Sequence, residues 1–388
     1  MGPRLTHYER AEWIHLRTLY QQLEVEVAHI SVLINTYNHE RYIEQAIVSV
    51  LEQDFPAEEM EILVVDDGST DGTPEIVGKF VPRVRYLRKE NGGQASAFNV
   101  SIPELHGRIV SFLDGDDWWA KEKLTAVAEA FGQNPEIAAV GHGFYEVRGD
   151  EPPREMFVPA KTCRLDLTSV EAARLADAGL TLLGTSRLSV RRDVLNRIGP
   201  LPHEVVFFDA PVFGLALALG GAIILDRPLC YYRQHSQNLY APIALDETTL
   251  RRRVERLGFL LSYVPPRLLA LGVAPEVVNA FTMSPQIEFD RAKLQSGEAG
   301  RWPVFRTELL RFHALYERPS IGYRLFECIV GACALLLPPR RFYQLLEWYG
   351  RNNLKRFRNI LGKAEPRVPP AFFQRVPVPE RDLQADRT

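Results

Sequence analysis

The stretch Ile109-Val110-Ser111-Phe112-Leu113-Asp114-Gly115-Asp116-Asp117-Trp118-Trp119 decides the fold, because an apolar run that predicts a buried strand ends on three carboxylates within four residues. Asp disfavours strands, and neighbouring ionised carboxylates repel one another unless a cation or hydrogen-bond donors neutralise them. Oxygen ligands at the end of a strand suit a hard divalent cation that substrate phosphates also bind. A solvated, Asp-rich turn that caps a helix from about Ala120 is the alternative.

Length and composition restrict the class of protein. The chain has 388 residues, 46% hydrophobic and 24% charged, which is ordinary for two globular domains or for one large domain with an appendage. A net charge of -3 argues against a dedicated nucleic-acid binder. The four cysteines lack metal or redox spacing, and neither a signal-peptide core nor a membrane-spanning apolar run is visible. These features predict a cytoplasmic chain.

Alternating strand and helix patterns predict an α/β fold. Strands are expected at 29–34, 61–65, 84–88 and 109–114, and helices at 39–52, 74–80 and 95–105. Because the strands are nearly continuous apolar runs, we expect a Rossmann-like, mostly parallel central sheet with helices on both faces. Ligands of such sheets bind beyond the carboxyl ends of the strands. The polar clusters at 35–38, 66–71 and 114–117 should therefore gather at one rim, which favours a binding site over a solvated turn.

The rest of the chain divides by composition. We expect an amphipathic helix in residues 1–28, a main domain in 29–245, a helical region in 246–363 and an extended or disordered tail in 364–388. Within the main domain, residues 168–199 are predicted to be helical around a glycine-rich turn.

Residues 339 to 363 form a basic amphipathic segment, which contains seven Lys or Arg and one acidic residue. Such a segment can lie on an anionic membrane surface, which would place the protein peripherally on the inner face of the membrane. It can equally pack on the main domain with its basic face in water. Both interpretations stay open.

Two common phosphate-binding motifs are missing from the sequence. No G-x-G-x-x-G follows the first strand, and no G-x-x-x-x-G-K-[ST] occurs. The sequence therefore argues against a dinucleotide dehydrogenase and against a P-loop enzyme. A metal at Asp116 and Asp117 is the obvious candidate to hold any phosphate.

Four motifs together resemble a family 2 glycosyltransferase in their order and spacing. They are Ser31–Asn38, Val64–Asp71, Asn91–Gln94 and Phe112–Trp118. The resemblance is strong over residues 29–119 and continues more weakly to about Asn238. It implies the GT-A fold, with a nucleotide-sugar half at 29–119, an acceptor half at 120–245 and a helical C-terminal appendage.

The resemblance also implies which residues bind a nucleotide-diphosphate sugar donor. Asn35 and Tyr37 would line the base pocket, and Asp67 would accept a hydrogen bond from the base. Gly93 and Gln94 precede or begin a helix and would face donor oxygens with backbone amides. For Asn35 and Tyr37 the alternative is turn and core packing, and for Asp67 it is a cap or an Asx-turn.

The same resemblance implies a site for Mg²⁺ or Mn²⁺ beside the diphosphate. Asp117 would bind the metal, Asp116 would approach the ribose and is a second candidate ligand, and Asp114 would support the carboxylates. Arg233 and His235 resemble the family's segment near the diphosphate, and His235 is also a candidate metal ligand.

The candidate catalytic base is Asp209. Inversion at the anomeric carbon needs a base opposite the leaving group, and the family supplies it from a Glu-Asp pair before a helix. Asp209 matches the second residue of that pair, while Phe208 replaces the usual acid. A helix N-cap is the alternative role.

These observations predict an inverting glycosyltransferase that moves a sugar to a hydroxyl acceptor with Mg²⁺ or Mn²⁺, as in cell-surface polysaccharide biosynthesis. The acceptor could be a lipid-linked saccharide, a polysaccharide, a protein or a small metabolite. A non-catalytic nucleotide-sugar-binding or scaffold protein is the alternative, which Phe208 favours. A nucleotidyltransferase ranks third, because a glycine-rich phosphate loop would be expected where this chain has residues 35–38.

Overall fold

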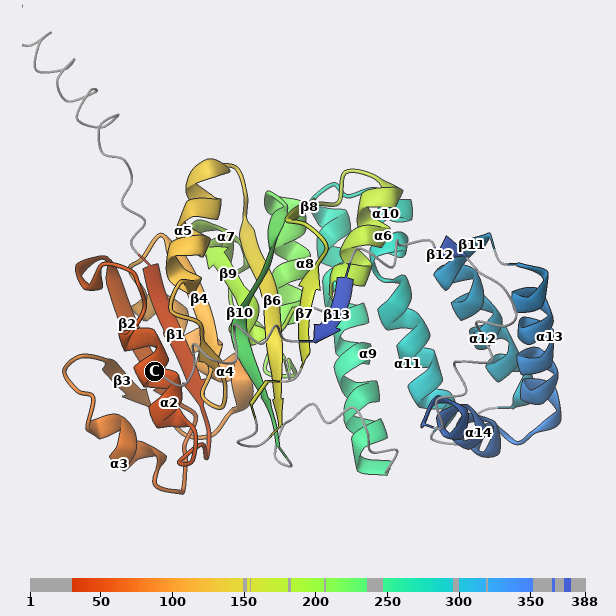
Figure 1. Cartoon of the computed structure of the whole chain (residues 1–388), viewed down its shortest axis with the longest axis horizontal. Helices are drawn as coiled ribbons and strands as arrows, with labels where there is room; N and C mark the ends of the chain where they lie inside the picture. Colours follow the sequence, from red (N-terminus) through yellow and green to blue (C-terminus); the bar gives the residue numbers. More distant parts are fainter. Residues whose placement is uncertain are drawn as a thin grey trace, which may run out of the picture.

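The computed structural model describes the residues in the following ranges: 30–148, 152–153, 155–180, 183–205, 207–235, 247–295, 300–318, 320–351, 365–366 and 373–377. Figure 1 shows a central sheet on one side and a set of helices on the other. The helix expected in residues 1–28 and the basic residues 352–363 lie outside the described part of the chain.

The first half of the main domain alternates strands and helices as predicted. Its elements are β1 (Ile30–Thr36), α2 (Ile43–Leu51), β2 (Met60–Asp66), α3 (Thr73–Gly78), β3 (Arg85–Arg88), α4 (Gly93–Ser101) and β4 (Ile109–Asp114). The strands are parallel and lie in the order β4-β1-β2-β3. Because the chain changes direction across the sheet between β3 and β4, right-handed crossovers place α2 and α3 on one face and α4 on the other. Ligands bind at such a reversal point.

The register of the parallel strands aligns their polar carboxyl ends. Asn35 at the end of β1 is paired with Asp114 at the end of β4, and Thr36 is paired with Asp66 at the end of β2. The predicted gathering of polar clusters at one rim is therefore confirmed.

The second half adds antiparallel strands to the sheet. Its elements are β5 (Trp118–Trp119), α5 (Lys123–Gln133), β6 (Ala139–Arg148), β7 (Glu155–Pro159), β8 (Cys163–Leu165), α6 (Val170–Gly179), β9 (Leu188–Arg191), α7 (Arg192–Ile198), α8 (Asp209–Leu219) and β10 (Ala222–Gln234). β9 lies between β4 and β6 and is antiparallel to both. The prediction that residues 168–199 are helical is therefore wrong at β9. β9 has only four residues, apolar and polar, buried between two strands. Such a short run does not let periodicity distinguish a strand from a helix.

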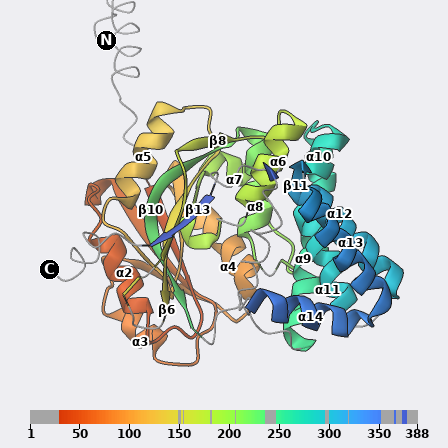
Figure 2. The ribbon, with the colours of Figure 1, turned by 45° about the vertical axis from the view of Figure 1, so that its right-hand side comes forward.

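The long strand β10, labelled in Figure 2, pairs with β5, β6 and β8. It runs parallel to β6, with register shifts around Pro228, and its later part also pairs antiparallel with β5. Cys230 is thereby placed opposite Trp119, and Tyr231 opposite Trp118. This pairing brings the residues after Tyr231 against the carboxylates that precede β5.

Helices α9–α14 form the C-terminal region. They are α9 (Glu247–Ala270), α10 (Pro275–Phe281), α11 (Met283–Gln295), α12 (Arg301–Leu315), α13 (Ile321–Leu336) and α14 (Pro339–Arg351). α9 and α10 share the main core, where Val264 and Phe281 pack close to Gly214 of α8. A second, smaller core joins α11, α12, α13 and α14 through Leu294, Val304 and Phe342, among others.

Two short strand pairings involve residues 365–366 and 373–377. β13 (Phe373–Pro377) adds an antiparallel strand beside β7, and β11 (Tyr316–Arg318) pairs with β12 (Glu365–Pro366). None of the helices in the described ranges combines the length and apolar character that crossing a bilayer requires.

Candidate active site

The carboxyl of Asp117 is buried and hydrogen-bonded at both oxygens. Oδ2 accepts a bond of 2.6 Å from Ser186 Oγ, and Oδ1 accepts one of 2.9 Å from the backbone amide of Arg233. Burial and the neighbouring charge of Asp116 nevertheless raise the pKa of Asp117 to about 7. A bound cation would offset this burial and favour the charged carboxylate.

Asp116 faces two imidazole rings. Its Oδ2 lies 3.0 Å from His235 Nε2 and 3.8 Å from His39 Nε2. Burial opposes the charged form, but the hydrogen bond with His235 and the charge of His39 outweigh it and lower the pKa of Asp116. The ring of Tyr42 stacks on His235 at 4.9 Å between centroids, which fixes the imidazole against the carboxylate.

Asp114 and Asp209 come from opposite halves of the domain, and the charge of Asp209 acts on Asp114. Burial, together with the charges of Asp116, Asp117 and Asp209, raises the pKa of Asp114 well above its usual range. Asp209 is the first residue of α8, and its Oδ1 accepts a 2.7 Å bond from the amide of Ala210. Burial raises the pKa of Asp209, although the Ala210 amide and nearby arginines act against it.

Phe208 is fully buried rather than facing the site. Its ring lies 4.9 Å from that of Phe98 on α4 and 5.0 Å from that of Phe112 on β4, centroid to centroid. Where the resemblance leads us to expect an acid, the chain therefore has an aromatic side chain that attaches α8 to the sheet.

The end of β1 carries an unpaired polar side chain. Neither polar atom of the buried Asn35 side chain has a hydrogen-bond partner within the described ranges, whereas Tyr37 nearby is 43% exposed. Buried polar groups in proteins are nearly always paired. Asn35 is therefore a group that a ligand can satisfy.

Asp67 is engaged by the loop that leads into α4. Its Oδ1 accepts bonds from Lys89 Nζ at 2.6 Å and from the Gly92 amide at 3.0 Å, and its Oδ2 accepts one from the Gly93 amide at 2.7 Å. The Gly93 amide, expected to face donor oxygens, is thus bound to Asp67, while Gln94 Oε1 is buried without a partner among the described residues.

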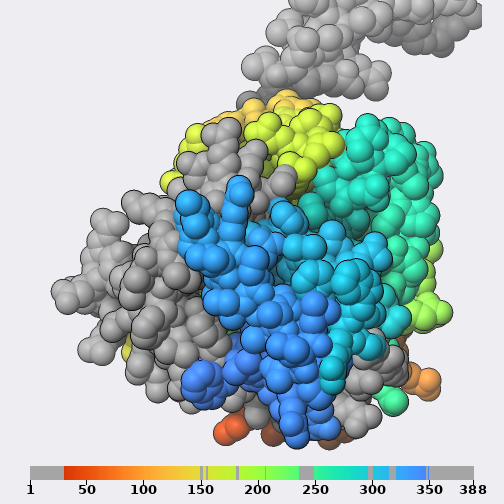
Figure 3. All heavy atoms as spheres, turned by 90° about the vertical axis from the view of Figure 1, so that its right-hand side faces the viewer, coloured from red at the N-terminus to blue at the C-terminus, as the bar shows by residue number. Residues whose placement is uncertain are grey.

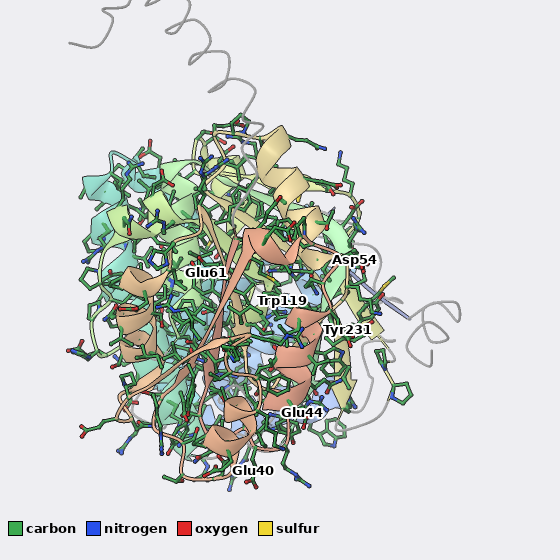
Figure 4. The ribbon with its side chains drawn as sticks, turned by 90° about the vertical axis from the view of Figure 1, so that its left-hand side faces the viewer. Glu40, Glu44, Asp54, Glu61, Trp119 and Tyr231 are labelled. Atoms are coloured by element: carbon green, nitrogen blue, oxygen red, sulfur yellow. The ribbon has the colours of Figure 1, made fainter. Side chains whose placement is uncertain are left out.

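The guanidinium of Arg233 is built into the wall of the site. It lies between the rings of Tyr42 and Trp118, with its Cζ 4.8 and 4.6 Å from their centroids. Its Nε donates to the carbonyl of Asp116 at 3.2 Å, and a terminal nitrogen donates to Gln45 of α2. Trp119 and Tyr231, the neighbours of this stack, are labelled beside α2 in Figure 4. Arg233 therefore positions β5 and β10 around Asp116.

Three residues near the carboxylates escaped the sequence argument: His39, Ser186 and Arg187. His39 directly follows the motif that ends at Asn38, so its position was a usable signal. Ser186 and Arg187 lie in a short 3₁₀ turn (Thr185–Arg187) before β9, inside a region predicted to be helical. Only the missed strand would have drawn attention to them.

The side chains of Asp116, Asp117 and His235 carry donor atoms of the types that bind divalent cations. The structure places the two aspartates and the imidazole around one rim, and a hydrogen-bonded carboxylate oxygen keeps a second lone pair for a metal. Carboxylate oxygen and imidazole nitrogen together suit Mn²⁺, and the carboxylates alone suit Mg²⁺. Within the described ranges, however, no three His, Cys, Asp or Glu side chains already converge as a metal site.

Comparison with known proteins points to one family. The model of "Glycosyl transferase family 2" matches residues 31–199. An uncharacterized glycosyltransferase of Nostoc sp. is 28% identical over 282 residues, which is 68% of this chain and 82% of that protein. The poly(ribitol-phosphate) beta-N-acetylglucosaminyltransferase TarS of Staphylococcus aureus is 41% identical over 102 residues, 25% of this chain and 18% of that protein.

A solved structure shares the fold. The crystal structure of S. aureus TarS 1-349 in complex with UDP-GlcNAc superimposes with a TM-score of 0.51 at 20% identity, covering 84% of this chain and 92% of that one.

Proposed function

We propose that this chain, which is similar to glycosyl transferase family 2 over residues 31–199 and shares the GT-A fold, is an inverting glycosyltransferase. It would use a nucleotide-diphosphate sugar and Mg²⁺ or Mn²⁺. The observation that carries this proposal is that the charge of Asp209, at the start of α8, acts on Asp114 among the carboxylates after β4. The acceptor is a hydroxyl compound that approaches from the side of α8.

The donor is proposed to bind along the carboxyl ends of β1, β2 and β4. Asn35 supports this assignment because its buried amide lacks a partner within the described part of the chain. Asp67 and Tyr37 would complete the base pocket, and the side chain of Gln94, with an unpartnered buried oxygen, is a further donor contact. When bound, the metal would stabilise charge on the diphosphate as a Lewis acid, held by Asp116, Asp117 and His235.

The proposed reaction is a displacement at the anomeric carbon. The acceptor oxygen attacks this carbon while its bond to the diphosphate oxygen breaks, and the nucleoside diphosphate leaves with the bonding electrons. Asp209 accepts the hydroxyl proton as general base. The raised pKa of Asp209, caused by burial, suits this role because a base works best with a pKa near the working pH.

A thermal-shift screen of nucleoside diphosphates and their sugars, with and without Mn²⁺, tests donor binding. We expect stabilisation that depends on the metal, because the carboxylates need a cation to share the site with a diphosphate. No stabilisation by any nucleoside diphosphate with metal would contradict the proposal.

The variant Asp209→Asn tests the chemistry. Turnover should fall about 10³-fold, while donor binding stays within about twofold, since only the general base is removed. Asp193→Asn is the matched control, because Asp193 occupies the first turn of the neighbouring helix α7 and is exposed. Full turnover in Asp209→Asn would assign the base elsewhere, and a wild-type chain that binds donor but transfers to no acceptor would favour the scaffold alternative.

We further propose that the C-terminal helices contact a membrane surface, which would suit a lipid-linked acceptor. The exposed apolar side chains Ile321, Leu325, Ile329 and Leu336 lie along α13, and exposed Arg340 and Arg341 begin α14. Figure 3 shows this outer surface in blue. An apolar face with basic residues suits anionic lipid, to which each Lys or Arg adds about 1 kcal/mol.

Sedimentation with vesicles tests this contact. The chain should sediment with vesicles that contain phosphatidylglycerol, and Ile329→Asp should release it, because a carboxylate would enter the apolar face. Equal recovery with neutral phosphatidylcholine vesicles, or no effect of the substitution, would favour the alternative in which the basic face simply lies in water.

A further inference from the structure

The guanidinium of Arg187 is held by aromatic rings. No side-chain hydrogen bond or ion pair of Arg187 occurs among the residues that the structure describes, and the side chain is half-buried. Its Cζ lies 4.2 Å from the centre of the Phe144 ring and 5.7 Å from that of Tyr232. Stacking on ring faces leaves the N–H groups at the edge of the guanidinium plane free to donate. The arginine is therefore held in place by aromatic rings, while its N–H groups have no hydrogen-bond partner in the part of the chain that the structure describes.

The position of Arg187 is fixed by its neighbour in the chain. Ser186 donates to Asp117 and accepts from the Asp114 amide, so the 3₁₀ turn that carries Arg187 is attached to the carboxylates. The positive charge of Arg187 reaches both Asp117 and Asp209, since it lowers the pKa of each against the dominant effect of burial. The turn that carries Arg187 is thus bonded to the carboxylates, and the charge of its guanidinium acts on the proposed base.

Gly184 makes room for this arrangement. A Cβ at Gly184 would come within 2.2 Å of an Arg187 terminal nitrogen, although the backbone φ of -157° is extended and open to any residue. Position 184 needs a glycine because the guanidinium occupies the space that a Cβ would fill, and not because of the backbone conformation. Only a flexible side-chain end would have to move in Gly184→Ala, so that variant displaces the guanidinium and keeps the arginine.

The surroundings of Arg187 favour the acceptor over the donor. Its ring partners Phe144 and Tyr232 belong to β6 and β10 of the second half, and a second arginine, Arg256 of α9, also lowers the pKa of Asp209. The donor diphosphate has its own cation in the proposed metal. An acceptor that carried negative charge would be repelled by the carboxylates around Asp209 unless a cation received it.

We propose that Arg187 binds an anionic group of the acceptor, a phosphate or a carboxylate, next to the hydroxyl from which Asp209 takes the proton. The planar guanidinium matches either group through two parallel hydrogen bonds. This inference rests on the proposed function, because it assigns the acceptor to the side of Asp209. It narrows the acceptor to phosphorylated or acidic saccharides and alcohols.

The test measures binding of small anions to the full chain by ligand-observed NMR, with the donor site filled by a nucleoside diphosphate and the diamagnetic Mg²⁺. The probes are glycerol phosphate, glucuronate and the neutral glycerol, so that the two anion sources are separated. We expect the wild type to bind one of the anions and not glycerol. Arg187→Gln and Gly184→Ala should weaken that binding about tenfold or more, as expected for hydrogen bonds to a charged group.

Two variants serve as controls. Arg197→Gln removes the same charge from an exposed position on α7 and should leave anion binding within about twofold of wild type, because exposed charges are screened. Arg187→Lys keeps the charge and should retain part of the affinity, which separates lost binding from lost folding.

Several outcomes would overturn the inference. Equal anion binding in wild type and Arg187→Gln would do so, and so would a loss of nucleoside diphosphate affinity in Arg187→Gln with anion binding unchanged, since Arg187 would then contact the donor. The proposed function fails separately, when wild type binds no nucleoside diphosphate with Mg²⁺ or Mn²⁺. In that case the same anion titration without nucleotide still tests whether Arg187 forms an anion site.

Discussion

The proposed donor side and the proposed acceptor side of the site are held by different forces. On the donor side, Asp67 and Asp117 each receive hydrogen bonds at both carboxylate oxygens from neighbouring loops and strands. On the acceptor side, Asp209 receives a bond from the next amide in its own helix, and the preceding Phe208 packs into an aromatic cluster. Polar networks demand particular residues at fixed spacing, whereas packing accepts any side chain that fills the space. This difference fits the proposal that the motifs resembling the family lie around the donor, while Phe208 precedes the proposed base Asp209.

The strongest test of this comparison is Phe208→Ala. Removing the ring should lower the free energy of unfolding by about 3–5 kcal/mol, because it leaves a cavity between α4, α8 and β4. Phe207→Ala is the control, since the neighbouring ring is only half-buried. Chemical denaturation measures both, and an equal loss in the two variants would show that Phe208 does not anchor α8.

Phe208→Glu sharpens the same point by restoring the family's acid. Its carboxyl would be buried beside the rings of Phe98 and Phe112, so we expect a larger loss of stability than for the alanine variant. A stable Phe208→Glu variant with raised turnover would mean that the acid can reach the site without this burial.

Ser186→Ala tests the hydrogen bonds that tie the two sides together. Its hydroxyl lowers the pKa of Asp117, so its loss should raise that pKa above about 7 and favour the protonated carboxyl. Affinity for Mn²⁺ with a nucleoside diphosphate should fall about 10–100-fold, with a larger loss at pH 6.5 than at pH 8. Isothermal titration measures the effect.

The matched control is Ser189→Ala, three residues along. Ser189 is buried and bonds Ser111 and Lys123 instead of the carboxylates. It should change stability but not metal affinity. Equal metal affinities in Ser186→Ala and wild type would remove Ser186 from the site.

Sequence reasoning reached the donor side because local signals coincide there. β1, β2 and β4 are apolar runs that end in polar residues, and parallel pairing alone brings Asn35 and Asp114 together. Periodicity and short motifs were sufficient for the fold class and for the rim. The individual roles of Asn35, Tyr37, Asp67 and the other site residues stay predictions.

The acceptor side could not be predicted in the same way because its determinants are tertiary. β9 has four residues and owes its strand conformation to β4 and β6 on either side. Arg187 becomes conspicuous only once the rings of Phe144 and Tyr232 are placed beside it. Gly214 of α8 is likewise explained only by the fold, because a Cβ added there would come within 3.1 Å of the Phe281 ring on α10. Each of these features depends on contacts between residues far apart in sequence.

The smallest predicted effect concerns the joint between α6 and α11, which lies outside the site. Asp177 of α6 is buried, and its Oδ2 accepts bonds from the Ser284 hydroxyl at 2.6 Å and from the Ser284 amide at 3.2 Å. Burial outweighs these two bonds and raises the pKa of Asp177 from 3.8 to about 7. The folded state therefore holds a proton here that the unfolded state releases near pH 4. The resulting stabilisation is complete below that pH and is lost as the pH rises through about 7.

As the pH rises from 5 to 8, the free energy of unfolding should fall by about 1–3 kcal/mol less in Asp177→Asn than in wild type. The reason is that an amide accepts the hydrogen bond from the same hydroxyl without titrating. Asp193→Asn, exposed on α7, should leave the slope unchanged. Asp114 and Asp117 also have raised pKa values and contribute to the same slope, but their share should shrink when a nucleoside diphosphate and Mn²⁺ occupy the site. The difference between Asp177→Asn and wild type should persist with those ligands bound, since Ser284 and α6 lie outside the rim. If the ligands abolished that difference, the joint between α6 and α11 would be coupled to the donor side, and the two regions could not be treated as separately held.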